Sequence, residues 1–206
     1  MTDRLLKGHL KTMFVKKERA NAALALLLLA SLTIACSALK NLGSDETADA
    51  NKLVQSGNED MKAASKIADD NIDQKVRDYT AAAKNNDKAG AKKVLEDSIK
   101  AIDDGTAKGK SAADKFDQAS KKKISDPYKQ YLQFKSQSVS KQVEAFQEYR
   151  KALVILRDND AALTSQKAKD DYRQALDNFK KLTNEADDLD KKADEVARQN
   201  PDKIKA

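Results

Sequence analysis

The chain has 206 residues, with 39 Lys and Arg, 33 Asp and Glu, only 6 Gly and 2 Pro, and a single cysteine. So few turn-forming residues exclude a sandwich or barrel of many short strands, and one cysteine excludes a disulfide framework or a multi-cysteine metal site. A mean hydropathy of −0.75 excludes a polytopic membrane protein. The composition instead indicates a protein of long helices.

The net charge of +6 comes mainly from the first segment of the chain. Residues 1–35 hold six basic and two acidic side chains, so the remaining residues have a balance of only +2. Those remaining charges are interspersed, and they form no basic stripe with interleaved aromatic residues of the kind that binds nucleic acid. We therefore expect no nucleic-acid partner.

The N-terminal segment has the composition of a secretory signal. An uncharged apolar run at 20–35 directly follows the basic stretch 16–19. A positive flank, a short apolar core and small residues at its end are the three parts of such a signal. Met13 would give it a more compact start than the first residue, and the only histidine, His9, lies before Met13. The sequence thus predicts a signal peptide over 1–35, with Met13 as an alternative start.

The apolar run ends Leu32-Thr33-Ile34-Ala35-Cys36, and this ending resembles the signal of bacterial lipoproteins. In that family a small residue precedes a cysteine, the chain is cleaved between the two, and lipid is attached to the thiol. The resemblance implies cleavage between Ala35 and Cys36, lipidation of Cys36, and a location in the cell envelope outside the cytoplasm. Ser37 stands where the family uses Asp for retention in the inner membrane. In a bacterium with two membranes, the resemblance therefore implies the periplasmic face of the outer membrane.

An uncleaved membrane anchor is the alternative for the same segment. Residues 20–39 are 20 residues without a charge, which is about the length of a membrane-spanning helix. Polar residues dilute this run, and its strongly apolar part covers only 24–30. In the lipoprotein interpretation, residues 36–47 comprise the lipidated cysteine and the link to the helical region, and Gly43 with its small polar neighbours predicts a flexible tether.

Beyond the tether, apolar residues recur every three or four positions, as on one face of a helix. The first stretch predicts one helix over about 48–84, and Asp87 is a candidate N-cap for the next helix. The second stripe continues through Gly105 and Gly109 without a change of phase. It predicts an unbroken helix with Lys121–Lys123 in its last turn, where cations suit the helix dipole.

Two further helices follow. Ser125-Asp126-Pro127 predicts a helix start, with Asp126 as the N-cap and Pro127 at the first helical position. A polar turn is expected between Arg157 and Ser165, and the last helix should end at Asn200-Pro201, leaving 201–206 as a C-terminal tail.

The predicted fold over 48–200 is all-α. Four helices of about 35 residues, joined by short links, suit an elongated antiparallel bundle. The alternative is a three-helix, spectrin-like coil in which residues 160–165 do not interrupt the helix. Ala-rich stripes bury less apolar area than leucine stripes, so a slender bundle is expected.

No catalytic constellation is predicted for the region after Cys36. It lacks histidine, which excludes Ser–His–Asp and Cys–His nucleophiles and His-ligated zinc, and it has no glycine-rich phosphate loop. Its many acidic residues lie largely off the apolar stripes, which favours a solvated helix face over paired catalytic carboxylates. These acidic residues include Asp69, Asp70, Asp73, Asp103, Asp104, Asp170, Asp171, Asp187, Asp188 and Asp190.

The expected function is that of a lipid-anchored helical module, not of an enzyme. We expect no metal, no cofactor and no small-molecule substrate. The expected partners are the membrane, through the lipid, and an envelope protein, peptidoglycan or a second copy of the chain. Tyr128 and Tyr131, near a helix start, are the one pair that we single out as a candidate binding edge. A carboxylate-dependent envelope enzyme and an uncleaved membrane scaffold are the alternatives.

Overall fold

The computed structural model describes residues 46–69, 72–159, 163 and 165–204. Helices make up 89% of these residues, and no strand occurs among them. The prediction of an all-α protein is therefore confirmed for the part of the chain that the structure describes. The signal segment, Cys36 and most of the tether lie outside the described residues.

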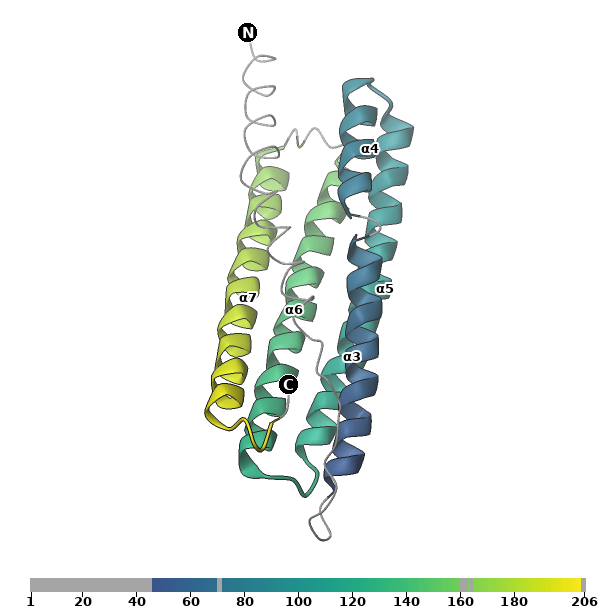
Figure 1. Cartoon of the computed structure of the whole chain (residues 1–206). Coiled ribbons are helices and arrows are strands. Elements are labelled where there is room, and N and C mark those ends of the chain that lie inside the picture. Colours follow the sequence, from purple (N-terminus) through teal and green to yellow (C-terminus); the bar gives the residue numbers. More distant parts are fainter. Residues whose placement is uncertain (1–45, 70–71, 160–162, 164, 205–206) are drawn as a thin grey trace.

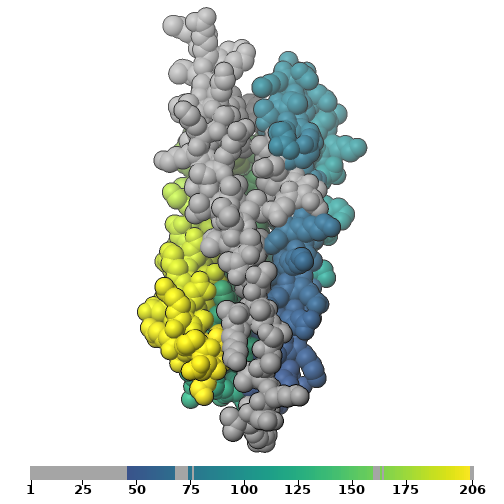
Figure 2. Space-filling model, viewed as in Figure 1, coloured from purple at the N-terminus to yellow at the C-terminus, as the bar shows by residue number. Residues whose placement is uncertain are grey.

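Five helices follow one another in the described chain. They are α3 (Thr47–Asp69), α4 (Ile72–Lys84), α5 (Lys88–Ser120), α6 (Asp126–Asp158) and α7 (Gln166–Gln199). Figure 1 shows their axes side by side in an elongated molecule, and in Figure 2 α3 and α4 follow one another along one side, with α7 on the other. The closest packing runs in chain order from α3 through α5 and α6 to α7, and α4 packs on α5.

Hydrogen bonds across the seams join α6 to α5 on one side and to α7 on the other. Ser136 Oγ on α6 donates to the Ala113 carbonyl on α5 at 2.9 Å, and Arg150 on α6 pairs with Asp103 on α5. On the other side of α6, Ser138 Oγ donates to the Ala186 carbonyl on α7 at 3.0 Å. Between α5 and α6 the residue number rises on one helix as it falls on the other.

The prediction of a single helix over 48–84 is wrong, because α3 ends at Asp69 and α4 begins at Ile72. The sequence at this point is Asp69-Asp70-Asn71. Residues 70 and 71, between the two helices, lie outside the described residues. The apolar stripe steps by four from Ala68 to Ile72 and so stays in phase, which is why periodicity predicts one helix where the structure has two.

The start of α5 and the continuity of the helix are confirmed. Asp87 Oδ1 accepts a hydrogen bond from the Gly90 backbone N–H at 2.8 Å, as an N-cap does. The helix then continues through Gly105 and Gly109 without interruption. However, α5 ends at Ser120, so Lys121–Lys123 lie in the link to α6 rather than in the last turn.

At the start of α6 the predicted capping residue is wrong by one position. Ser125 has the extended backbone of an N-cap (φ −62°, ψ 147°), while Asp126 is already helical. No side-chain hydrogen bond caps this helix. The Asp126 carboxylate lies in the first turn, 3.6 Å from Lys129 Nζ, where a negative charge is favourable beside the positive end of the helix dipole.

The break between the last two helices is also present. Asp158 ends α6, and Ser165 caps α7 by accepting a hydrogen bond from the Ala168 N–H at 3.1 Å. This break excludes the unbroken helix that a three-helix coil requires. α7 ends at Gln199, as the Asn200-Pro201 pair predicts.

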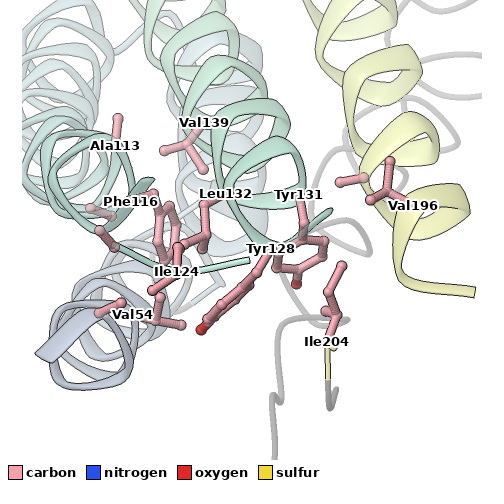
Figure 3. Packing of buried hydrophobic residues seen from close by; sticks show 14 of the residues in the cluster. Val54, Ala113, Phe116, Ile124, Tyr128, Tyr131, Leu132, Val139, Val196 and Ile204 are labelled. Carbon is pink, nitrogen blue, oxygen red and sulfur yellow. The ribbon is translucent and has the colours of Figure 1, made fainter. Parts of the chain in front are cut away.

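The apolar core has two parts along the molecule. The larger part joins α3, α5, α6 and α7, and it contains most of the fully buried side chains, including Phe116 and Leu132. Figure 3 shows how its residues converge from these elements. The smaller part, at the α4 end, joins Leu95, Ile99 and Ile102 of α5 to two leucines of α6.

The C-terminal segment belongs to the core rather than forming a free tail. Backbone hydrogen bonds from Lys203 and Ile204 to the Asn200 carbonyl, both 3.0 Å, turn the chain back on itself. Ile204 is 5% exposed and lies in the larger core part with Tyr128 and Tyr131. The last turn therefore covers the end of the bundle at which α6 begins.

Candidate functional site

The predicted lipidation and cleavage residues, Cys36 and Ala35, lie outside the described residues. The first described residue is Glu46, which lies near the end of the predicted tether. Glu46 is bound to the link between α5 and α6.

Glu46 is held by both its backbone and its side chain. Its backbone N–H donates to the Lys123 carbonyl at 3.0 Å, and its carboxylate accepts from the Lys123 backbone N–H at 2.9 Å and from Lys122 Nζ at 3.3 Å. The hydrogen bond from the Lys123 backbone, followed by the one from Lys122, lowers the pKa of the Glu46 carboxyl. The start of the described chain is thus bound to the end of the bundle where α5 passes into α6 (Figure 1).

Tyr128 and Tyr131 are placed in the core. Tyr128 is 9% and Tyr131 4% exposed, and their ring centroids are 6.3 Å apart. Tyr128 Oη donates to Asn51 Oδ1 on α3 at 2.7 Å. Burial, followed by the nearby Asp194 and Asp190 carboxylates, raises the pKa of Tyr131. Tyr128 therefore links α6 to α3, and both rings pack within the core, so little of either ring is accessible to a partner (Figure 3).

A polar cluster that the sequence analysis did not identify lies between α3 and α5. The Asp60 carboxylate accepts hydrogen bonds from Ser111 Oγ and Lys115 Nζ, both at 2.6 Å, and from Lys108 Nζ at 3.2 Å. Burial by itself raises the pKa of Asp60, but the three hydrogen bonds outweigh it and lower the pKa to about 2. The Asp60 carboxylate is therefore stabilised in its charged form, and the three side chains that donate hydrogen bonds to it all belong to α5.

A second buried ion pair lies between α6 and α7. Lys135 Nζ is 2.7 Å from Asp190 Oδ1 and 3.5 Å from Asp194 Oδ1, and the Lys135 side chain is only 5% exposed. The same ammonium group lies 5.7 Å from the centre of the Tyr131 ring, within the range of a cation–π contact. The interpretation of Asp190 as part of a solvated face is therefore wrong, because this acid lies in the helix seam.

Residue spacing could have identified these buried charges. Lys135 lies between Leu132 and Val139 at steps of three and four, and Asp190 lies likewise between Ala186 and Ala193. Both positions belong to the buried stripe by helical periodicity. Lys135 and Asp190 differ from the rest of the stripe only in being charged. A buried charge is tolerated when an opposite charge faces it across the seam.

The two buried acids are not arranged as a catalytic pair. Asp60 lies in the α3–α5 seam and Asp190 in the α6–α7 seam, and each is bound to lysine. Among the described residues, no group of three or more His, Cys, Asp and Glu side chains could hold a metal ion. Likewise, none of the described helices is long and apolar enough to cross a membrane.

Comparison of the chain with protein-family models, with characterised proteins and with solved structures gave no match. Its function is therefore inferred from its own residues and geometry.

Proposed function

We propose that the chain is a lipid-anchored lipoprotein of the bacterial envelope, which holds an extracytoplasmic helical bundle at the membrane as a structural or binding module. One observation carries this proposal: the uncharged run 20–35, preceded by a basic stretch, ends in Ala35 and the only cysteine of the chain, Cys36.

The described region suits such a module. We infer that its helices form an elongated antiparallel bundle in which α3 and α4 together occupy the place of the first long helix. Helices of 33 and 34 residues, such as α6 and α7, are about 50 Å long at 1.5 Å per residue. The buried charges support a structural role, because lysines bind both Asp60 and Asp190 across helix seams.

The lipid would provide firm attachment. Each buried methylene group contributes about 0.8 kcal/mol, so diacylglycerol with an amide-linked acyl chain exceeds the two signals that stable anchoring requires. The bundle would then be confined near the membrane, where its exposed helix faces meet an envelope protein, peptidoglycan or a second copy.

Mass spectrometry of the protein extracted from membranes tests the proposal. We expect an N-terminal peptide that begins at Cys36 and carries the mass of the lipid. Cys36→Ala should abolish both processing and modification, whereas the neighbouring Ser37→Ala should leave them intact. Membrane-extracted protein with an intact 16–40 peptide and an unmodified thiol would contradict the proposal.

That contradicting result would support the second candidate, an uncleaved anchor. The observation in its favour is the absence of charge over 20–39, which suffices for a spanning helix. Cys36→Ala discriminates the two, because it should leave the membrane association of a spanning segment unchanged.

A further inference from the structure

The attachment point of the bundle fixes which of its ends is near the membrane. Glu46 is bound to Lys122 and Lys123 in the α5–α6 link, and the opposite end carries the α4–α5 link at 85–87 (Figure 1). The C-terminal turn with Ile204 lies at the Glu46 end as well. We call this end, formed by Glu46, 121–126 and 200–204, the α5–α6 end.

The length of the tether between Cys36 and Glu46 limits how the bundle can be oriented relative to the membrane. Ten residue steps separate Cys36 from Glu46, and a fully extended chain spans at most about 35 Å over that length. α5 has 33 residues and is therefore about 50 Å long. A bundle standing upright with its α4–α5 link on the membrane would place Glu46 about 50 Å from the lipid surface, beyond the reach of the tether.

Exposed lysines are present at the α5–α6 end. Lys123 and Lys203 are exposed. Lys122 is bound to Glu46, and the charge of Lys123 also acts on the Glu46 carboxylate. Lys121 is exposed and pairs with Asp117, but an exposed pair of this kind is weak and leaves the ammonium group available. Asp126 and Asp202 are the exposed acids in these segments.

We propose that the α5–α6 end faces the membrane and that Lys121, Lys123 and Lys203 contact the headgroups of anionic phospholipids. This inference rests on the proposed lipid anchor. The anchor brings the lysines within reach of the surface, and the negative surface potential, which acts over roughly 10 Å, favours the lysines at the surface. The α4–α5 link then points away from the lipid and is presented to partners in the envelope.

Two labelled variants of the full lipidated protein test the orientation. Acylation blocks Cys36, so a cysteine introduced by Gln118→Cys or Ala89→Cys is the only free thiol. Both positions are exposed on α5, and they are separated by about 44 Å along that helix. In phosphatidylglycerol vesicles with a headgroup-attached quencher, a fluorophore at position 118 should be quenched strongly and one at position 89 weakly.

The outcomes separate the orientation from the anchor. Failure of the unlabelled protein to enter vesicles would count against the proposed function. Stable insertion with equal quenching at both positions, or with stronger quenching at position 89, would overturn the proposed orientation while leaving the anchor intact.

Charge reversal tests the headgroup contact. The double variant Lys123→Glu and Lys203→Glu should reduce quenching at position 118 in phosphatidylglycerol vesicles, with a loss of roughly fivefold in the docking equilibrium for each lysine. Lys92→Glu with Lys93→Glu, which are exposed near the other end of α5, is the matched control and should have little effect. An equal effect of both pairs, or the same effect in phosphatidylcholine vesicles, would overturn the contact.

Discussion

Individual side chains hold this bundle together at points where its alanine-rich stripes bury little apolar area. Asp60 and Lys135 each replace an apolar residue in a helix seam, and each is matched by an opposite charge on the neighbouring helix. A buried charge without a partner is costly, so such pairs favour the register in which the charges meet. We therefore expect these residues to select the alignment of the helices as much as to stabilise it.

The stability contributed by Asp60 should depend on pH. Its pKa in the folded protein is about 2, against 3.8 for an unperturbed aspartate carboxyl. A lowered pKa stabilises the folded state above the unfolded value, and this stability is lost as the pH falls from about 4 towards 2. The shift corresponds to about 2 kcal/mol. Asp60→Asn should lower the free energy of unfolding by that amount at pH 7, with little difference near pH 2.

Urea denaturation at several pH values between 2 and 7 would measure this difference. Glu59→Gln, which removes the exposed neighbouring carboxylate, is the matched control and should change stability little. A difference between Asp60→Asn and the unmodified protein that stays constant down to pH 2 would show that the carboxylate acts by packing rather than by charge.

Lys135 and Asp190 should behave as a coupled pair. Lys135→Met leaves the Asp190 carboxylate buried beside an apolar side chain and should lower the free energy of unfolding by about 3–5 kcal/mol. The double variant Lys135→Met and Asp190→Leu removes both charges and should recover most of that loss. A double-mutant cycle measured by chemical denaturation gives the coupling energy. A double variant no more stable than Lys135→Met would refute the pairing.

At the scale of helices, close packing depends on where glycine occurs in α5. A Cβ atom at Gly109 would lie 2.9 Å from Val143 Cγ2 on α6, whereas one at Gly105 would lie 3.9 Å from its nearest neighbours on α3, the Ala64 carbonyl oxygen and Ile67 Cγ2. Of these two glycines, only Gly109 lies so close to a neighbouring helix that a side chain would clash. Gly105 carries the cost of glycine in a helix without that compensation.

Alanine substitutions should therefore have opposite effects at the two positions. Gly105→Ala should raise the free energy of unfolding by about 0.5–1 kcal/mol, because it removes backbone entropy from the unfolded chain. Gly109→Ala should lower it by about 1 kcal/mol or more, since Val143 is β-branched and has little freedom to move. Thermal denaturation of the two variants gives the sign directly. Destabilisation by both changes would indicate that α5 packs equally closely at Gly105.

For the whole molecule, the residue after Cys36 should decide which membrane the proposed lipoprotein reaches in a bacterium with two membranes. By resemblance to the lipoprotein family, Ser37 permits transfer to the outer membrane, whereas Asp at this position causes retention. In a host with two membranes, Ser37→Asp should move the protein to the inner-membrane fraction, and Ser37→Ala should not. Separation of the two membranes by density, followed by immunoblotting, measures the distribution. An unchanged distribution of Ser37→Asp would contradict this route.

Sequence patterns alone correctly predicted the all-helical class, the cap at Asp87, the continuity of α5 and the break before Ser165. These features depend on periodicity and on local hydrogen bonds, which act within a few residues of the chain. The same local reasoning predicted one helix over 48–84, whereas the structure has α3 ending at Asp69 and α4 beginning at Ile72, because the apolar stripe keeps the same phase on both sides of 70–71.

Which charges are buried, and where Glu46 is bound, depends on packing between helices and could not be predicted from one stripe at a time. Asp60, Lys135 and Asp190 are buried because an opposite charge faces each of them from another helix, and that pairing depends on an alignment that a single stripe does not contain. Glu46 meets Lys122 across 76 positions of sequence. The end of the bundle that follows the tether was therefore fixed by packing, since contacts at such separation arise only when the helices are assembled.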